Sequence, residues 1–255
     1  MSGLGRKVWR RLPEGLRDRL RVALYNRRCA PARFSLRDGV YATTFQGQEL
    51  KTWDHPFELV EGLRRYLRRQ APSPGQVVVD AGAFHGLYAL WFASRVGPGG
   101  RVVAVEPDAG NLRSLRRNLA LNPGLRVDVV EEPLWSEVAE VGFFPQGNVA
   151  SSFFWSPAGQ AAEPRRTTTL DVIVASLSLP RLDFVKMDVE GAEVHALRGA
   201  EASILKLRPC FAVASYHQVD GGPTFPAVEA FFRASGYGCE TVSYGVECMT
   251  YGWPG

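Results

Sequence analysis

The stretch that decides the fold is "VVVDAGAFHG", which runs from Val77 to Gly86. Three valines lead into Asp80, and Gly82 and Gly86 follow with three residues between them. β-Branched residues favour strands, and glycine permits the tight turn that joins a strand to a helix. The stretch therefore predicts a strand, a turn whose backbone can approach a ligand, and a helix that begins near residue 86.

The turn after this strand lacks one glycine of a well-known pattern. A dinucleotide fingerprint is G-x-G-x-x-G, in which the second glycine lets the backbone reach a pyrophosphate. Here Ala83, Phe84 and His85 follow Gly82, so that second glycine is missing. The turn therefore favours a ligand that has a nucleoside but no phosphate, of which S-adenosylmethionine is the common one. A nicotinamide-dependent oxidoreductase is the alternative that the missing glycine disfavours.

A second motif, "VVAVEP", places Glu106 and Pro107 at the end of the next apolar strand. A carboxylate at this point can accept hydrogen bonds from both hydroxyls of a ribose, because paired acceptors fit a vicinal diol. The two motifs in this order predict a cofactor site. Its predicted residues are Asp80, Gly82, Ala83, Phe84, His85, Gly86, Glu106 and Pro107.

From Val77 onward, apolar strands alternate with helical stretches. Such alternation predicts an α/β fold with a doubly wound, mostly parallel sheet and helices on both faces, in which ligands bind beyond the C-terminal strand ends. The aromatic segment 141–169 interrupts the pattern and predicts a hairpin-like insertion near the rim of the site. The predicted strands are 77–80, 101–106, 126–130, 183–188 and 210–216, and the predicted helices lie near 86–95, 109–121, 191–206 and 225–235.

The breaker "APSPGQ" at 71–76 divides the chain into an extension, 1–70, and a main domain, 71–255. The extension holds 16 Lys and Arg against 7 Asp and Glu, whereas the main domain holds 14 against 19. Residues 6–28 predict a basic amphipathic helix with a leucine every four residues. We expect this helix to dock on the core or on a second subunit, and attachment to an anionic membrane surface is the alternative. Short strands are predicted within 32–53 and a helix over 56–70.

Composition indicates a soluble globular protein, since 45% of the 255 residues are apolar and 22% are charged. No run of about eighteen apolar residues predicts a membrane span. The N-terminus shows no apolar signal core, and the four cysteines have no metal-ligand spacing. These observations predict a cytoplasmic protein with reduced thiols.

A third group of residues predicts the reacting centre. Lys186 lies within an apolar strand, where an unpaired cation is costly, and Asp188, Glu190 and His217 follow strand ends. Charges gathered at strand ends are typical of a site, although Asp188 and Glu190 also suit the N-terminus of a helix. The candidate catalytic residues are therefore Asp188, His217, Glu190 and Lys186. A divalent metal at Asp188 and Glu190 is conceivable, but no ligand spacing requires one, and none is expected.

Three stretches resemble the FkbM-type S-adenosylmethionine-dependent methyltransferases: "VVVDAGAFHGLYAL", "VVAVEPDAGNLRSLRRNLALN" and "LDFVKMDVEGAEVHALRGA". The resemblance covers roughly residues 77–217. It implies a seven-stranded methyltransferase sheet, cofactor binding at Asp80–Gly86 and Glu106, and usually an O-methylation. The chain departs from many relatives at His85, where they carry Asn, and in "ASYHQ", where they place an acid before the histidine.

The sequence thus predicts an S-adenosylmethionine-dependent O-methyltransferase that acts on a hydroxyl of a small molecule, natural product or glycan. A nucleic-acid methyltransferase is an alternative, because the N-terminus is basic and the pI is near 9.0. Base methylation commonly uses prolines and an aromatic residue after the fourth strand, and this chain has "DVEG" there. We therefore expect no nucleic-acid partner, and a non-catalytic scaffold is disfavoured by the intact cofactor motifs.

Overall fold

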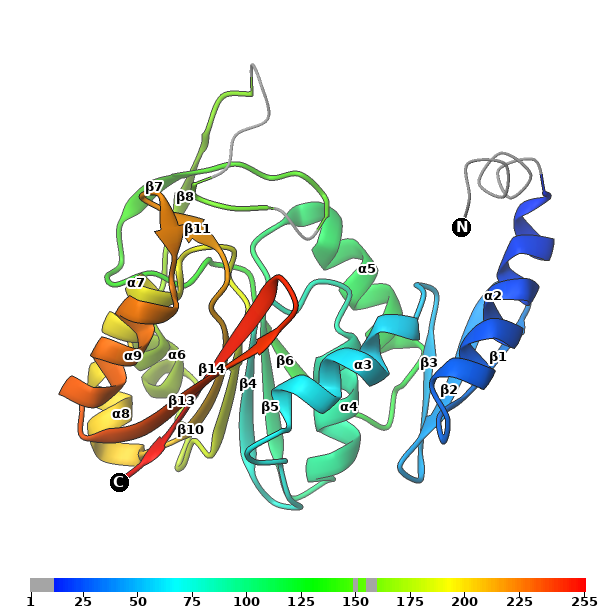
Figure 1. The fold of residues 1–255 in the computed structure, drawn as a ribbon, viewed down its shortest axis with the longest axis horizontal. Coiled ribbons are helices and arrows are strands. Elements are labelled where there is room, and N and C mark those ends of the chain that lie inside the picture. Colours follow the sequence, from blue (N-terminus) through cyan, green and yellow to red (C-terminus); the bar gives the residue numbers. More distant parts are fainter. Residues whose placement is uncertain (1–11, 149–150, 155–159) are drawn as a thin grey trace.

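A seven-stranded sheet forms the centre of the protein, shown in Figure 1 as a computed structural model that describes residues 12–148, 151–154 and 160–255. Its strand order is β13-β14-β10-β9-β4-β5-β6, and β14 runs antiparallel to both of its neighbours while the other pairings are parallel. The predicted doubly wound, mostly parallel seven-stranded sheet is confirmed. The strands are β4 (Val77–Ala81), β5 (Arg101–Val105), β6 (Val127–Val130), β9 (Phe184–Met187), β10 (Cys210–Ala214), β13 (Tyr237–Tyr244) and β14 (Glu247–Pro254).

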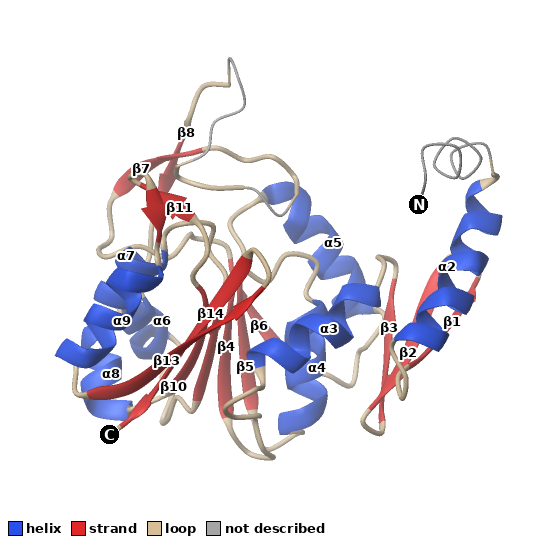
Figure 2. Cartoon of the chain, viewed as in Figure 1, coloured by secondary structure: helices blue, strands red, loops and turns tan. Residues whose placement is uncertain are grey.

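Helices cover both faces of this sheet (Figure 2). Successive residues of a strand point to opposite faces, so Val78 joins one apolar cluster while Val77 and Val79 join the other. All five residues of β4 are buried, as expected for a strand covered on both faces. The first cluster lies against α3 (Phe57–Tyr66), α4 (Leu87–Val96) and α5 (Ala109–Ala120), and the second against α6 (Leu170–Ser176), α7 (Glu193–Arg198), α8 (Glu201–Leu207) and α9 (Phe225–Ala234).

The helix predicted over 191–206 is wrong in one respect, because it is two helices, α7 and α8, that meet at Gly199. The chain passes so close to another segment there that a Cβ on Gly199 would lie 2.1 Å from the carbonyl oxygen of Trp135. This tertiary approach interrupts the helix. The apolar periodicity continues across the break, which explains why the sequence predicted one helix.

Strands β13 and β14 complete the sheet after residue 235, where no strand was predicted from local pattern. Polar side chains in β13 obscure the strand pattern. Thr241 donates a hydrogen bond to Glu229 of α9 and lies 2.8 Å from Thr250 of β14. The polar groups are therefore satisfied between elements, which makes a polar strand stable in this position.

The aromatic insertion forms an antiparallel pair, β7 (Glu140–Phe143) with β8 (Glu163–Arg166). The predicted hairpin is confirmed for the described residues, and the positions 149–150 and 155–159 within it lie outside them. In Figure 1 this pair lies above the upper end of the central sheet. A smaller antiparallel pair, β11 (Gln218–Val219) with β12 (Gly222–Pro223), follows β10 at the same end.

The N-terminal extension contains α2 (Glu14–Arg28) and a three-stranded sheet. Asn118 of α5 and Asn122, which follows that helix, accept hydrogen bonds from the backbone of the segment that carries the last of these strands, which fixes the extension on the main domain. The strands are β1 (Arg33–Arg37), β2 (Val40–Phe45) and β3 (Gln48–Thr52).

The leucine face of α2 does not dock on the core, contrary to the first expectation. Leu16, Leu20 and Leu24 are 44–57% exposed, and the helix packs instead through Val22 and Tyr25. The ring of Tyr25 stacks on Phe57 with centroids 4.2 Å apart. Contact of the leucine face with a second subunit or a membrane surface stays a prediction. No helix in the described part of the chain has the length and apolarity that a membrane span requires.

Candidate functional site

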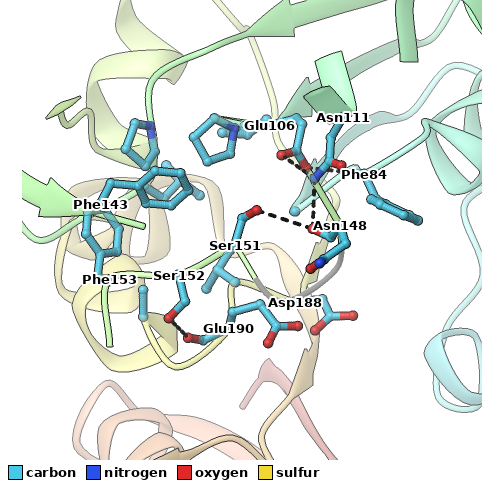
Figure 3. Close-up of a pocket in the computed structure, with 17 residues that line it drawn as sticks. Phe84, Glu106, Asn111, Phe143, Asn148, Ser151, Ser152, Phe153, Asp188 and Glu190 are labelled. Atoms are coloured by element: carbon cyan, nitrogen blue, oxygen red, sulfur yellow. Dashed lines mark hydrogen bonds between the residues drawn. The ribbon is translucent and has the colours of Figure 1, made fainter. Parts of the chain in front are cut away.

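Two adjoining pockets open beyond the C-terminal ends of β4, β5 and β9, where ligands bind in such sheets. Their volumes are about 80 and 730 Å³, and Gly82, Phe84, Asp188 and Glu190 line both of them. Figure 3 shows the smaller pocket, with Glu106 near one end and Asp188 and Glu190 near the other. A ligand that filled both pockets would pass these shared residues.

Glu106 follows β5 and is a buried acceptor in the smaller pocket. One carboxylate oxygen accepts from the N–H of Phe84 at 2.8 Å, and the other from the N–H of Asp108 at 3.0 Å and the amide of Asn111 at 3.1 Å. Burial raises the pKa of Glu106, although these hydrogen bonds oppose it. A carboxylate has about four lone-pair sites, so roughly one remains for a ligand hydroxyl.

Asn111 supplies a second acceptor that sequence reasoning missed. Its side-chain oxygen is buried, lines the smaller pocket and has no hydrogen-bond partner in the structure. Asn111 lies in the first turn of α5, and its amide donates to both Glu106 and the carbonyl of Asn148. Glu106 and Asn111 together therefore fit a diol better than Glu106 alone. The sequence signal was weak, because Asn in a first turn is also ordinary capping chemistry.

Asp108 ties this helix to the aromatic insertion. One of its oxygens caps α5 by accepting from the N–H groups of Gly110 and Asn111, and the other accepts from the N–H of Gly147 and the hydroxyl of Ser151. Burial alone would raise the pKa of Asp108, but these hydrogen bonds lower it below its usual value. A single ionised side chain therefore positions one wall of the pocket.

The remaining walls of the smaller pocket are mainly apolar. Flat apolar walls with a few polar groups at one end are typical of nucleoside sites. With the acceptors of Glu106 and Asn111, these walls have the chemistry that an adenosine site requires. They come from Val105, Pro107, Pro133, Leu134, Phe143, Phe153 and Val189.

The glycine turn of β4 has a structural cause besides any ligand. Gly82 has φ +75°, and a Cβ there would lie 1.8 Å from the carbonyl oxygen of Asp188 on the neighbouring strand end. Gly86 also has positive φ and begins α4. Ala83 and His85 line the larger pocket, where a nitrogen of the His85 ring lies 3.6 Å from a carboxylate oxygen of Asp54.

Asp80 and Lys186 form a fully buried ion pair across β4 and β9, with Nζ 3.0 Å from Oδ1. The same Nζ donates to the carbonyl of Gly82 at 2.6 Å. Asp80 lines neither pocket, whereas Lys186 lines the larger one. The geometry thus favours a positioning role for Asp80. Its carboxylate pairs with Lys186, and Lys186 in turn donates to the carbonyl of Gly82 in the glycine turn. Direct cofactor contact by Asp80 stays a prediction.

Asp188, Glu190 and His217 come together where the two pockets meet. Nε2 of His217 lies 3.5 Å from Oδ1 of Asp188 and 3.3 Å from Oε1 of Glu190. His217 is only 6% exposed, and both its Nε2 and the Asp188 Oδ1 lack a hydrogen-bond partner. The sequence therefore grouped these three residues as the structure does.

Glu193 of α7 supports this cluster and was not among the predicted residues. It is fully buried, its Oε1 lies 2.8 Å from Nδ1 of His217, and its Oε2 accepts from the hydroxyl of Thr224 at 3.1 Å. Burial lowers the pKa of His217, but Glu190, Glu193 and Asp188 outweigh it and raise that pKa to about 11. The imidazole is therefore protonated at neutral pH when only protein groups surround it.

Two tyrosines complete the surroundings of Asp188, and only the tertiary structure brings them there. Tyr66, from α3 in the extension, donates to Asp188 Oδ2 at 2.7 Å. Burial first, and the charge of Asp188 second, raise the pKa of Tyr66 well above its usual value, so it stays a donor. Tyr216 lines the larger pocket beside Asp188 and Glu190, and burial with these carboxylates raises its pKa as well.

Comparison with known proteins agrees with this geometry. The methyltransferase FkbM domain model matches residues 80–239, which is more than half of the chain. The chain belongs to the FkbM methyltransferase family. A methyltransferase FkbM from Methylobacillus flagellatus KT has a similar structure, with a TM-score of 0.54 and 21% identity over 74% of this chain and 47% of that chain.

Two further relatives are more distant or much longer. The AMB antimetabolite synthetase AmbE of Pseudomonas aeruginosa is 30% identical over 173 residues, which are 53% of this chain and 8% of AmbE. Fibrillarin of Aeropyrum pernix, solved with bound S-adenosyl-L-methionine, matches with a TM-score of 0.49 and 13% identity over 86% of this chain and 97% of that chain. This chain spans less than half the length of AmbE and of the Methylobacillus protein.

As an FkbM-family methyltransferase, the chain uses S-adenosylmethionine. We expect its adenosine at the smaller pocket, because Glu106 and the unpartnered oxygen of Asn111 lie at the end of an apolar slot. Phe84 lies between this slot and the larger pocket, and its N–H holds Glu106 in place. The individual contacts of Ala83, His85, Gly86 and Pro107 with the cofactor stay predictions.

Proposed function

We propose that this methyltransferase transfers the methyl group to a hydroxyl oxygen of a small molecule or a glycan. The observation that carries the proposal is the junction of the two pockets. Asp188 lines both, and its buried Oδ1 is an acceptor without a partner. An acceptor hydroxyl that entered from the larger pocket would donate its hydrogen bond there and present its oxygen towards the cofactor pocket.

Asp188 is well held for such a role. Its Oδ2 accepts from Tyr66, so the carboxylate plane is fixed while Oδ1 stays available. The bound cofactor supplies an electrophilic methyl group on a sulfonium, whose positive charge disperses in the transition state. A carboxylate next to that sulfur would favour the ground state, so the useful task of Asp188 is to orient the hydroxyl and take its proton.

His217 is a weaker candidate for the proton acceptor than Asp188 or Glu190. Its pKa of about 11 means that it already carries a proton at neutral pH. A protonated imidazole donates rather than accepts, so we assign His217 to positioning Asp188 and Glu190. Its assignment as the general base stays a prediction from the sequence.

The larger pocket supports a small acceptor. Its volume of about 730 Å³ lies within the range of roughly 300–1,000 Å³ that is typical of small-molecule sites. Its lining combines aromatic faces with polar groups, which suits a hydroxylated molecule such as a sugar. Trp53, His55, Tyr88 and Tyr216 provide the aromatic faces, and Arg65 and Glu247 provide an ion pair. The relative AmbE is an antimetabolite synthetase, which agrees with a small-molecule context.

The test is a transfer screen with cofactor that carries a deuterated methyl group. Candidate polyols, phenols and glycans are incubated with the chain, and mass spectrometry with fragmentation locates the label. The proposal expects label on oxygen, and label only on nitrogen or carbon would refute it. Asp188→Asn should lower kcat by ~10²–10⁴-fold with cofactor Kd nearly unchanged, because the amide keeps the shape but loses the charge. Asp54→Asn, which alters another acid of the larger pocket, is the matched control.

A further inference from the structure

The cluster of Asp188, Glu190 and His217 has the composition and spacing of a metal site. One ligand atom from each of the three lies within 4.8 Å of the others. The cluster is more than a group of acids, because the imidazole of His217 is 94% buried with Nε2 aimed at both carboxylates and without a hydrogen-bond partner. A buried nitrogen lone pair or N–H in this position needs a partner.

The distances suit a first-row divalent ion. For an ion about 2.1 Å from each ligand, the 3.3 and 3.5 Å separations from Nε2 to the two oxygens correspond to angles of roughly 104° and 113°. With these two angles the third angle, between the two oxygens, is at most about 143°, which places the oxygens at most about 4.0 Å apart, so the limit of 4.8 Å requires a side-chain movement of no more than about 0.8 Å. Asp188 and Glu190 are each about one quarter exposed, so neither side chain is fully enclosed.

The surrounding hydrogen bonds have the pattern found around metal ligands. A metal-bound histidine usually donates its other ring nitrogen to a carboxylate, which fixes the tautomer. Glu193 occupies this place at 2.8 Å from Nδ1 and is itself held by Thr224 and the N–H of Gly191. Tyr66 holds the other oxygen of Asp188 in the same way.

The charge of the cluster also favours a cation. Asp188, Glu190 and Glu193 are three carboxylates, and the ion pairs that the described structure gives them all go to His217. Lys186 does not neutralise them, because its Nζ pairs with Asp80 and donates to backbone carbonyls. One imidazole therefore faces three acids, and a divalent ion bound among them would balance their charge more fully.

We propose that Asp188, Glu190 and His217 bind a divalent metal ion between the two pockets. One nitrogen and two oxygen ligands suit Mn²⁺, Fe²⁺ or Zn²⁺ better than Ca²⁺, and three protein ligands leave a position open. Because Asp188 and Glu190 line both pockets, this position faces the place proposed for the acceptor oxygen. Binding of the metal ion does not depend on the proposed reaction. A role of the ion in polarising an acceptor hydroxyl rests on the proposed function.

The experiment measures Mn²⁺ binding by the tag-free chain after chelator treatment, without cofactor or acceptor. Titration followed by the electron paramagnetic resonance signal of free Mn²⁺ should give one ion per chain. A pulsed spectrum of the bound ion should show coupling to one imidazole nitrogen. Asp188→Asn and His217→Gln should each raise the Mn²⁺ Kd at least tenfold, and His217→Gln should remove the nitrogen coupling. Glu247→Gln, an acid of the larger pocket that pairs with Arg65, should leave the Kd unchanged.

Two further measurements keep the outcome unambiguous. Melting temperature and S-adenosylmethionine affinity show that each variant is folded, and Glu193→Gln should weaken Mn²⁺ binding without removing the nitrogen coupling. Absence of a bound ion, or a Kd within twofold of wild type in both Asp188→Asn and His217→Gln, overturns the proposal. Mn²⁺ binding together with methyl label only on nitrogen or carbon would instead refute the proposed function and leave the metal site standing.

Discussion

Replacement of Glu106 tests the cofactor pocket most directly. Glu106→Gln keeps the length of the side chain but removes the charge and turns one acceptor oxygen into a donor. In the structure the two oxygens accept from Phe84, Asp108 and Asn111, and about one lone-pair site is left for the ribose. Loss of one charged hydrogen bond to the ligand costs about 1–3 kcal/mol, which corresponds to a Kd roughly 5–150-fold higher.

Glu106→Ala separates the ligand contact from the support that Glu106 gives to its neighbours. It leaves three donors without this acceptor, so we expect a lower melting temperature in addition to the weaker binding. Asn111→Leu removes the second acceptor together with the amide that donates to Glu106 and to the carbonyl of Asn148, and should weaken cofactor binding by about 1 kcal/mol. Its effect and that of Glu106→Gln should be less than additive if one diol bridges both residues.

Calorimetric titration with S-adenosylmethionine and with S-adenosylhomocysteine measures these affinities. Asp128→Asn is the matched control, because Asp128 lies on the adjacent strand β6 and pairs with Arg101 away from both pockets. Its Kd should equal that of the wild type. The reasoning is refuted if Glu106→Gln binds both ligands with wild-type affinity while its melting temperature is unchanged.

Three other expectations concern stability. Gly82→Ala should lower the free energy of unfolding by ~3 kcal/mol or more, because its Cβ would overlap the Asp188 carbonyl. Gly47 also has positive φ but has open space around it, so Gly47→Ala should lower that free energy by only ~1–2 kcal/mol. Urea unfolding compares the two variants, and equal losses would show that backbone conformation alone matters. Lys186→Met should lower the free energy of unfolding by ~3–5 kcal/mol, because it leaves Asp80 buried and unpaired. Addition of Asp80→Asn should recover part of that loss in the same assay, and no recovery would contradict the pairing. Because the pKa of Asp108 is lowered in the folded state, its contribution to stability is present above about pH 4 and is lost as the pH falls through the folded pKa. Asp108→Asn should therefore lower the melting temperature at pH 7 by the equivalent of ~1–2 kcal/mol, and by less at lower pH. A difference in melting temperature that does not depend on pH would contradict this expectation.

The sequence by itself determined the five parallel strands of the sheet and the strand ends at which the candidate site residues lie. Local signals were sufficient for this, because a run of valines, a carboxylate at a strand end and a glycine turn each act over a few residues. Parallel strands that end at one edge bring their terminal residues together, so Asp188, Glu190 and His217 could be grouped without coordinates.

Tertiary structure decided which further residues contact the predicted site residues. The amide nitrogen of Asn111 bonds to Glu106 and leaves its oxygen as a pocket acceptor, Tyr66 reaches Asp188 from the extension, and Glu193 contacts the other ring nitrogen of His217. These contacts join residues that are distant in sequence or whose local role is ordinary helix chemistry. No periodicity or motif records such pairings.

The remaining differences have the same origin. The leucines of α2 have the spacing of a buried face, yet the stacking of Tyr25 on Phe57 selects another face of the helix. The break between α7 and α8 follows from the approach of Trp135 to Gly199. Sequence pattern determines which faces of a helix or strand can be buried. Packing against residues that are distant in sequence determines which of those faces are buried in the folded protein.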